Sequence, residues 1–292
     1  MAGINDTVSV IIPAKNEETS LTNLLPLLKR TLPNAEIIVV NDGSTDATAE
    51  ICEKNKVRAI NNPYSKGNGA AIKSGARAAK NNVLVFMDAD GQHKPSDIPR
   101  LIEVLHQGYD MVVGSRSRTG QANFWRAWAN NFYCKMASWM VNHQIDDLTS
   151  GFRVVRARKF RRFLSLLPNG FSYPTTITMS FFRSGYSVAY CPIHTEQRDG
   201  KSHINLFRDG IRFLLVIFKI GVLYSPMRIF LRFSLAFFII GIAYYLYTYI
   251  NFGRFTNMSA LLFIASVVVF LIGLISEQIT MLMYQNTDRA KD

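Results

Sequence analysis

The chain is poor in acidic residues and in cysteine. It contains 21 aspartates and glutamates against 33 lysines and arginines, which gives a net charge of +12. Its three cysteines, Cys52, Cys134 and Cys191, lie far apart in the sequence. An odd number of cysteines without metal-ligand or redox spacing argues against a disulfide framework, a zinc site and a dithiol centre. We therefore expect three buried or helix-surface thiols in a reducing compartment.

Long apolar runs are absent up to about Ile204, where short apolar runs alternate with polar segments. The N-terminus also lacks the basic segment and short apolar run of a secretory signal peptide, so we expect this part of the chain in the cytosol. A length of 292 residues suits one domain of about 200 residues with an appendage.

Beyond this point the chain becomes apolar and aromatic. Phe233–Ile250 and Phe255–Ser276 contain no charged residue, and each approaches the roughly 20 residues that cross a bilayer. The linker Asn251–Arg254 is short, so the two spans should form a hairpin. The tyrosines that suggest an interfacial belt are Tyr244, Tyr245, Tyr247 and Tyr249. The alternative, an apolar hairpin inside a soluble core, is disfavoured because soluble helices of this length usually carry a polar face.

Basic residues flank this hairpin unevenly. Those before the first span are Arg208, Arg212, Lys219, Arg228 and Arg232. Arg289 and Lys291 follow the second span, and only Arg254 lies between the two, which predicts that both termini are cytoplasmic. The segment Leu206–Leu223 mixes basic and apolar residues like a helix in the lipid headgroup layer. Anionic lipid explains this charge distribution better than nucleic acid does.

The N-terminal part alternates predicted strands and helices. The strands are Val8–Ile12, Glu36–Val40, Arg58–Asn61, Val83–Met87 and Met111–Gly114, and the helices are Glu18–Arg30, one from Thr45, Gly69–Lys80 and Ser96–His106. This order predicts an α/β fold with a mainly parallel sheet between helix layers. The strand ends at Pro13, Asn41, Asn61 and Asp88 should then share one edge of the sheet.

The fourth of these strands ends in two carboxylates, Asp88 and Asp90. Alternate residues of an extended chain point the same way, so both carboxylates can face one divalent cation. Hard oxygen ligands favour Mg²⁺ or Mn²⁺ over zinc. Taken alone, an Asp-x-Asp pair is more typical of a turn that ends a strand and caps the next helix. The other motifs of the chain must therefore distinguish a metal site from a turn.

Two further polar clusters, Pro13–Glu18 and Asn41–Asp46, also follow strands and precede helices, and each alone is typical of turn and cap chemistry. The motifs that continue the series are Lys66–Ala71, Asp88–His93, Gly114–Arg116, Asp147–Arg153 and Arg198–Ser202. In this order they resemble a family 2 glycosyltransferase of the GT-A fold. More narrowly, the chain is similar to polyprenyl-phosphate glycosyltransferases, such as dolichol-phosphate mannosyltransferase and bacterial undecaprenyl-phosphate glycosyltransferases.

The resemblance covers Val8–Ser202 by motif and the hairpin by architecture. It implies a cytoplasmic GT-A domain over 1–205, an amphipathic interfacial region over 206–227, a transmembrane hairpin over 228–285 and a cytoplasmic tail over 286–292. The protein would then be a multi-pass protein of the cell (inner) membrane. Free apolar faces on a two-helix anchor are compatible with a homo-oligomer.

The resemblance also implies the donor site. The residues expected around the nucleoside-diphosphate sugar are Pro13, Lys15, Glu17, Asp42, Lys66, Asp88, Ala89, Asp90, Gln92, Arg198 and Lys201. Of these, Asp88, Asp90 and Gln92 would hold Mg²⁺ or Mn²⁺. Gly67 and Gly69, at a helix start, would let backbone approach the nucleotide, although a flexible helix entry explains them equally well.

The acceptor implied by the resemblance is a lipid phosphate. Its oxygens are already ionised near neutral pH, so no catalytic base is expected. The residues expected to bind this phosphate are Arg116, Arg126, Asn130 and Ser138. The two arginines suit this role because guanidinium groups match phosphate geometry. Arg126 is equally typical of a surface arginine beside the aromatic cluster Phe124, Trp125 and Trp128, because arginines stack readily on such rings. Arg198 would offset the negative charge that builds on the leaving group. The residues expected to be catalytic are Asp88, Asp90, Arg116 and Arg198.

Asp147 and Arg153 are secondary candidates. In relatives with hydroxyl acceptors an acidic residue near Asp147 serves as base, whereas here it is expected to orient arginines or shape the sugar pocket. Arg153 would point back towards the site from a turn at Gly151. The basic run Arg153–Arg162 suits a phosphate-binding wall or a solvated helix face, and the solvated face is the preferred interpretation for its last four basic residues. His203 stands where the family often has lysine, so it is a phosphate contact or a loop histidine.

The sequence therefore predicts an inverting, metal-dependent transfer of one sugar from a UDP- or GDP-sugar to undecaprenyl or dolichyl phosphate. The Gln-x-x-Arg-Trp signature of processive polysaccharide synthases does not occur. Two alternatives stay open: transfer to a lipid hydroxyl, giving a glycolipid, and a non-catalytic membrane scaffold that keeps the fold. The sugar, the nucleotide, the lipid and the oligomeric state are not specified by the sequence.

Overall fold

A computed structural model of the chain describes residues 7–116, 124–170, 172–193, 218, 221–223 and 225–289, with the backbone alone for 124–130 and 284–289. The chain divides into two compact units. One comprises Met1–Trp139 with His143–Ile204, and the other Met140–Asn142 with Asn205–Asp292.

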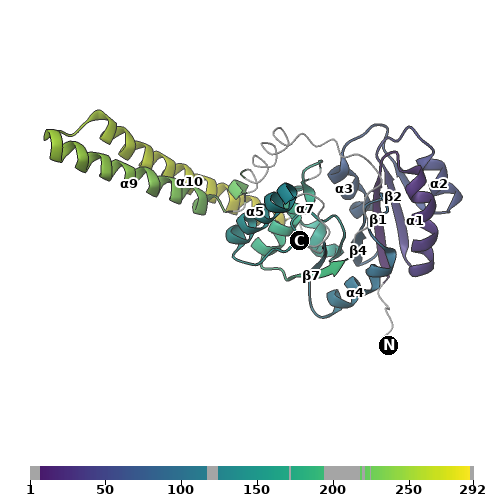
Figure 1. The fold of residues 1–292 in the computed structure, drawn as a ribbon. Coiled ribbons are helices and arrows are strands. Elements are labelled where there is room, and N and C mark those ends of the chain that lie inside the picture. Colours follow the sequence, from purple (N-terminus) through teal and green to yellow (C-terminus); the bar gives the residue numbers. More distant parts are fainter. Residues whose placement is uncertain are drawn as a thin grey trace. The chain divides into compact units, whose positions relative to one another are not determined.

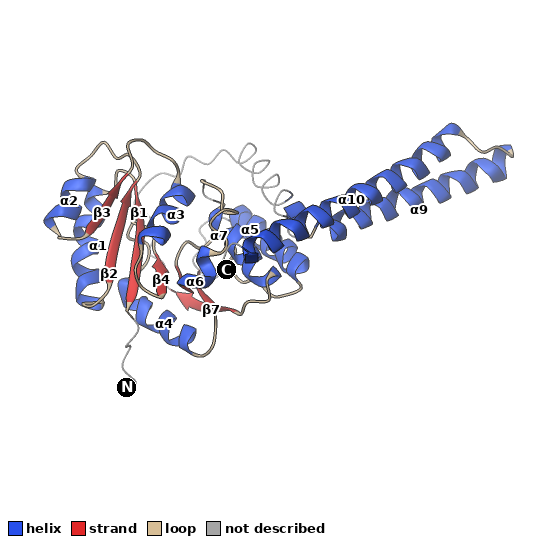
Figure 2. Cartoon of the chain, turned by 180° about the vertical axis from the view of Figure 1, so that it is seen from behind, coloured by secondary structure: helices blue, strands red, loops and turns tan. Residues whose placement is uncertain are grey.

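The first unit contains a seven-stranded sheet with the order β3-β2-β1-β4-β6-β5-β7 (Figures 1 and 2). The strands are β1 (Val8–Ala14), β2 (Glu36–Asn41), β3 (Arg58–Asn61), β4 (Val83–Phe86), β5 (Met111–Arg116), β6 (Arg153–Arg156) and β7 (Val188–Ile193). β6 runs antiparallel to β4 and β5, whereas all other neighbouring pairs are parallel. The predicted mainly parallel sheet is confirmed, and the antiparallel β6 and the parallel β7 are additions to the five predicted strands.

Helices alternate with these strands along the chain. They are α1 (Glu18–Thr31), α2 (Thr48–Lys54), α3 (Asn68–Ala78), the 3₁₀ turn η1 (Pro95–Asp97) leading into α4 (Ile98–His106), α5 (Phe124–Val141), α6 (Ala157–Arg161) and α7 (Tyr173–Arg183). Buried leucines of α1 and α4 pack with Val10 and Ile12 of β1 in one core. On the opposite face, Ile11 of β1 lies against Gly75 of α3. Covering on both faces explains why these strands are continuous apolar runs rather than alternating ones.

α2 begins at Thr48, three residues later than the sequence predicted. The intervening backbone is used by other partners, because the Thr45 N–H donates to Asn16 Oδ1 at 2.9 Å and the Ala47 N–H to Glu18 Oε2 at 3.0 Å. These bonds hold the segment after β2 as a turn, so the helix cannot begin until Thr48.

The second unit contains the helices α9 (Pro226–Phe252) and α10 (Asn257–Arg289). Pro226–Phe252 and Asn257–Met283 have mean hydropathies of 2.0 and 2.8 and are long and apolar enough to cross a membrane. The predicted pair of apolar helices is confirmed, with α9 extending beyond both ends of its uncharged run. Of the predicted interfacial helix, only 218 and 221–223 lie within the described residues, and these are helical.

A polar contact links α9 and α10. Ser234 Oγ donates to Ser266 O, and Ser266 Oγ donates to Ser234 O, both at 2.9 Å. Small residues let the helices approach closely: a Cβ at Gly273 would lie 2.6 Å from the Phe230 Cβ, and one at Gly241 would lie 3.1 Å from a Phe263 ring carbon. Small residues and interhelical hydroxyl bonds are the usual means of packing apolar helices in lipid.

Candidate active site

The ends of β1 and β2 are joined by hydrogen bonds into one structure. The Asn16 N–H donates to Ser44 Oγ at 3.0 Å, and the Glu17 N–H donates to Thr48 Oγ1 at 3.1 Å. Lys15 is exposed beside them. The first two motifs, which are far apart in the sequence, therefore lie side by side at one edge of the sheet. Pro13 is half-buried in β1.

Asp42, at the end of β2, organises the loop that precedes α3. Its Oδ1 accepts bonds from Asn62 Nδ2 (2.9 Å) and the Lys66 N–H (2.8 Å), and its Oδ2 accepts bonds from Ser65 Oγ (2.9 Å) and the Gly67 N–H (2.8 Å). Burial alone would raise the pKa of Asp42, but these four donors outweigh it and lower the pKa. This role of Asp42 was not predicted from the sequence, and the expected contact to a nucleobase stays a prediction.

The glycines at the start of α3 allow the backbone of Pro168 and Asn169 to approach closely. A Cβ at Gly69 would lie 2.1 Å from Pro168 O, and one at Gly67 would lie 2.5 Å from Asn169 O. The Ala70 N–H donates to Asn169 O at 3.1 Å. Neither expected reason, room for a nucleotide or a flexible helix entry, is needed to explain these glycines. Lys66 is exposed, with its ammonium nitrogen 5.6 Å from the Tyr64 ring centroid.

Asp88, Asp90 and Gln92 lie just after β4 and are all half-buried, and Ala89 between the carboxylates is buried. Asp90 Oδ1 accepts a bond from the Gln92 N–H at 3.2 Å, as in a turn. The described residues contain no group of three or more His, Cys, Asp or Glu side chains placed to hold a metal. Two carboxylates and an amide oxygen are hard donors of the kind that suits Mg²⁺ or Mn²⁺, and their role as metal ligands stays a prediction.

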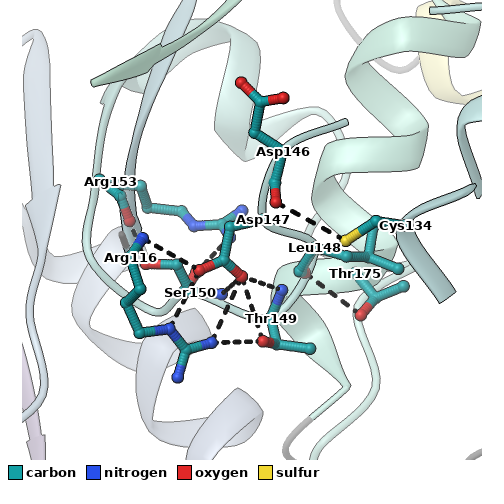
Figure 3. A network of polar contacts seen from close by, with 10 residues as sticks. Arg116, Cys134, Asp146, Asp147, Leu148, Thr149, Ser150, Arg153 and Thr175 are labelled. Carbon is teal, nitrogen blue, oxygen red and sulfur yellow. Dashed lines mark hydrogen bonds and ion pairs between the residues drawn. The ribbon is translucent and has the colours of Figure 1, made fainter. Parts of the chain in front are cut away.

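Arg116, at the end of β5, forms a two-point ion pair with Asp147 (Figure 3). Nε lies 3.0 Å from Oδ2 and Nη2 lies 3.3 Å from Oδ1, while Nη2 also donates to Thr149 Oγ1 at 2.5 Å. Burial opposes both charges, but the pair outweighs it, so the pKa of Asp147 is lowered and that of Arg116 is raised. The Arg116 side chain stays 37% exposed, whereas that of Asp147 is 4% exposed. Arg116 is therefore fixed in direction and still accessible.

Arg153, the first residue of β6, is fully buried. Its Nη1 donates to Pro174 O and Thr178 Oγ1, both at 3.2 Å, and its Nη2 donates to Ser150 O. The Tyr173 ring centroid lies 5.9 Å from the guanidinium carbon. Its guanidinium is thus enclosed by protein, and a direct contact with substrate is not supported.

The remaining residues expected to bind the acceptor are Arg126, Asn130 and Ser138. Arg126 and Asn130 lie on α5, where only the backbone is described. The Ser138 hydroxyl donates to Cys134 O at 2.6 Å and accepts from the Ile145 N–H at 2.9 Å, so it already has two partners. The expectations for Arg198, Lys201 and His203 lie outside the described residues.

His93 is a buried residue of the site region that sequence reasoning did not assign. Its ring stacks on Phe152 with a centroid distance of 4.9 Å. Burial is the main cause that lowers its pKa to about 4, so the imidazole is neutral near pH 7. Its place directly after Gln92 in the fourth motif was the only signal in the sequence.

The basic residues after β6 are not a uniformly solvated face, which corrects the preferred interpretation. Arg161 Nε donates to Ala76 O at 2.8 Å and so caps α3, and Lys159 pairs with Asp110. Arg162 donates to the Tyr186 hydroxyl. Of Arg158, Lys159, Arg161 and Arg162, Arg158 is exposed and the other three are half-buried. The charges are satisfied by elements distant in sequence, which a local pattern cannot indicate.

Solved structures with a similar fold support the fold class. Glucosyl-3-phosphoglycerate synthase from Mycobacterium tuberculosis, in complex with Mn²⁺, UDP-glucose and phosphoglyceric acid, matches with a TM-score of 0.61 and 18% identity, covering 74% of this chain and 80% of that one. A mycobacterial protein matches with a TM-score of 0.56 and 19% identity, over 68% of this chain and 69% of that one. The GT-A fold expected from the sequence is confirmed, with a divalent metal present in the first of these neighbours.

Sequence relatives include three enzymes that are named for the transfer or synthesis of lipid-linked sugars. The undecaprenyl-phosphate mannosyltransferase of Micrococcus luteus is 30% identical over 70% of this chain and 94% of its own length. The undecaprenyl-phosphate 4-deoxy-4-formamido-L-arabinose transferase of Pseudomonas paraeruginosa is 34% identical over 58% of this chain. That alignment spans only 56% of the transferase, little more than half its length. The polyprenol monophosphomannose synthase of Mycolicibacterium smegmatis is 29% identical over 65% of this chain and 77% of its own length.

Two family models match the chain in the order that the sequence predicted. The "Glycosyl transferase family 2" model covers residues 9–164, and the "GtrB C-terminal hairpin" model covers residues 225–282. The first spans β1 to the segment after α6, including the carboxylates after β4 and the Arg116–Asp147 pair. The chain therefore belongs to glycosyl transferase family 2 and carries the C-terminal hairpin of the GtrB type.

Proposed function

We propose that the protein transfers a single sugar, with inversion, from a UDP- or GDP-sugar to a polyprenyl phosphate at the cytoplasmic face of the membrane. The observation that carries this proposal is the combination of two carboxylates after β4 with an accessible, ion-paired Arg116 in the same domain. Relatives named for undecaprenyl-phosphate sugar transfer support the choice of acceptor.

On the donor side, Asp88, Asp90 and Gln92 would hold Mg²⁺ or Mn²⁺. The bound cation would neutralise charge on the donor diphosphate. Around the nucleotide, the proposed contacts are Pro13, Lys15, Glu17, Asp42, Lys66 and Ala89. The joined ends of β1 and β2 support this placement, because they bring the first two motifs to one edge of the sheet.

On the acceptor side, a phosphate oxygen would attack the anomeric carbon while the bond from that carbon to the nucleoside diphosphate breaks. No proton needs to be removed from an ionised phosphate, so the protein must position and stabilise rather than deprotonate. Among the described residues, Arg116 bonds Asp147 and Thr149 through Nε and Nη2, which leaves Nη1 for a phosphate oxygen. Further proposed contacts are Arg126, Asn130 and Ser138 to the acceptor, and Arg198 and Lys201 to the leaving diphosphate.

The two apolar helices support a multi-pass protein of the inner membrane. The basic residues around them favour cytoplasmic termini and a cytoplasmic catalytic domain. The proposed organisation is the catalytic domain over 1–205, the interfacial region over 206–227, the hairpin over 228–285 and the tail over 286–292. A homo-oligomer is compatible with this arrangement.

The proposal is tested by transfer from a panel of labelled UDP- and GDP-sugars in detergent, with Mg²⁺ or Mn²⁺, to undecaprenyl and dolichyl phosphate and, for comparison, to diacylglycerol and ceramide. We expect label to enter an organic-soluble, mild-acid-labile product that requires metal and is lost in the Asp90→Ala variant. Label entering only diacylglycerol or ceramide would indicate a hydroxyl acceptor and a glycolipid product. Absence of transfer with every donor and lipid, while nucleotide still binds, would favour the scaffold.

A further inference from the structure

The backbone of Gly151 lies directly against the Asp88 carboxylate. A Cβ at position 151 would be 2.7 Å from Asp88 Oδ2 and 3.2 Å from both its Cγ and its Oδ1. The φ angle of Gly151 lies outside the left-handed region, so the backbone conformation itself does not require glycine. A methyl group at this position would instead meet the carboxylate, so the Asp88 side chain would have to shift.

Hydrogen bonds to buried groups hold the turn that contains Gly151. The Ser150 hydroxyl donates to Gly114 O at 2.7 Å, and the Tyr173 hydroxyl donates to Gly151 O at 3.4 Å. Arg153 Nη2 donates to Ser150 O, and its guanidinium is itself fixed to α7 through Pro174 O. Because these hydrogen bonds hold the backbone of the turn in place, the turn cannot move away from Asp88 to make room for a side chain. Any added volume would therefore displace Asp88.

The same turn also holds the Arg116 pair. Asp147 Oδ1 accepts bonds from the Thr149 N–H at 3.0 Å and the Ser150 N–H at 3.1 Å (Figure 3). The residues from Asp147 to Gly151 therefore connect the guanidinium proposed for the acceptor to a carboxylate proposed for the donor. Arg153 anchors this connection without reaching the substrates.

We propose that Gly151 is a positioning residue that sets the place of the Asp88 carboxylate, with Arg153 as the buried anchor of its turn. The inference deepens the proposed function, on which its catalytic consequence rests. The contact itself is a property of the folded chain. It can therefore be tested without substrate.

The first test is a double-mutant cycle on thermal unfolding of the full chain in detergent. Gly151→Ala should lower Tm in the wild type, because the methyl group meets Asp88. In the Asp88→Ala background the same change should have little effect, because the carboxylate is gone. Gly170→Ala is the matched control, since a Cβ there meets nothing within 4 Å and its φ is also outside the left-handed region. Equal Tm losses for Gly151→Ala in both backgrounds would overturn the proposal.

The second test measures binding of UDP and GDP with and without Mn²⁺ by calorimetry, together with transfer kinetics. Gly151→Ala should weaken the Mn²⁺-dependent part of nucleotide binding by about tenfold or more, as supporting residues of metal sites do. Its kcat/KM should fall by about 100-fold, the usual scale for a misplaced reacting group. Unchanged binding and kinetics would overturn the role of Gly151. A wild type that binds Mn²⁺ and nucleotide but transfers no sugar would instead contradict the proposed function and leave the binding comparison valid.

Discussion

The carboxylate of Asp147 holds the guanidinium of Arg116 at two points, with Nε 3.0 Å from Oδ2 and Nη2 3.3 Å from Oδ1. The two residues are separated by 31 positions in the sequence. Because Asp147 is buried and Arg116 is partly exposed, the pair can fix the direction of a cation that still reaches solvent. A two-point contact of this kind sets both the position and the plane of the guanidinium.

The change Asp147→Asn should therefore weaken acceptor binding. Loss of the charged partner frees Arg116 to rotate, so the KM for polyprenyl phosphate should rise more than the KM for the nucleotide sugar. The unfolding free energy should fall by about 2 kcal/mol, the scale of a hydrogen bond to a charged group. Steady-state kinetics and urea unfolding in detergent measure the two effects.

A matched control is Asp97→Asn. Asp97 pairs with Arg100 at 3.6 Å, and the Arg100 side chain is 50% exposed. Exposed pairs of this kind contribute only about 0.2–1 kcal/mol. If Asp97→Asn and Asp147→Asn gave the same KM for the lipid, the orienting role of Asp147 would be excluded.

Asp42 should make stability depend on pH in the acid range. Its four donors lower its pKa in the folded state, so the folded protein binds the proton less readily than the unfolded chain does. The stability that Asp42 contributes is complete above the ordinary aspartate pKa of about 3.9 and is lost as pH falls through the lower folded value. Asp42→Asn should thus cost the protein more at pH 7 than at pH 3.

Urea unfolding of the wild type and Asp42→Asn at these two pH values tests this expectation. Ser65→Ala serves as the comparison, because it removes one of the four donors and leaves the carboxylate in place. A destabilisation by Asp42→Asn that is the same at both pH values would show that its hydrogen-bonded charge is not the source of the effect.

Arg153→Lys should be costly although the charge is kept. A lysine ammonium cannot reproduce a planar fork that bonds Ser150, Pro174 and Thr178 together. Breaking such a buried arrangement should lower the unfolding free energy by about 3 kcal/mol. Arg158→Lys, at an exposed position of the neighbouring helix, should change it by less than about 0.5 kcal/mol. Denaturant unfolding of both variants measures these changes. Similar decreases in unfolding free energy for the two variants would argue against an anchoring role for Arg153.

The serine pair of the hairpin should act as one unit. Ser234→Ala and Ser266→Ala should each destabilise the protein by about 0.6 kcal/mol, the average measured for such interhelical bonds. Because each serine donates to the backbone of the other and their hydroxyl oxygens lie 3.2 Å apart, the effects should not add fully. Thermal unfolding in detergent of both single variants and the double variant measures the coupling. Strict additivity would mean that the two hydroxyl groups do not depend on each other.

Several parts of the molecule were predictable from local patterns. Continuous apolar runs such as Val83–Phe86 indicated strands covered on both faces, and uncharged runs indicated the two C-terminal helices. The polar motifs that follow the strands identified the family through their order. β6 was not predicted, because a short strand that pairs antiparallel with β4 and β5 depends on neighbours distant in the sequence.

The sequence by itself therefore determined the class of fold, the apolar hairpin and the residue types at the site, because these follow from periodicity, composition and motif order. The tertiary structure alone decided which partner each charged side chain has. Only folding brings Asp42 under the loop before α3, Arg161 to the end of α3 and Gly151 against Asp88. The physical reason is that hydrogen bonds and steric contacts act over a few ångströms in space, whatever the separation of their residues along the chain.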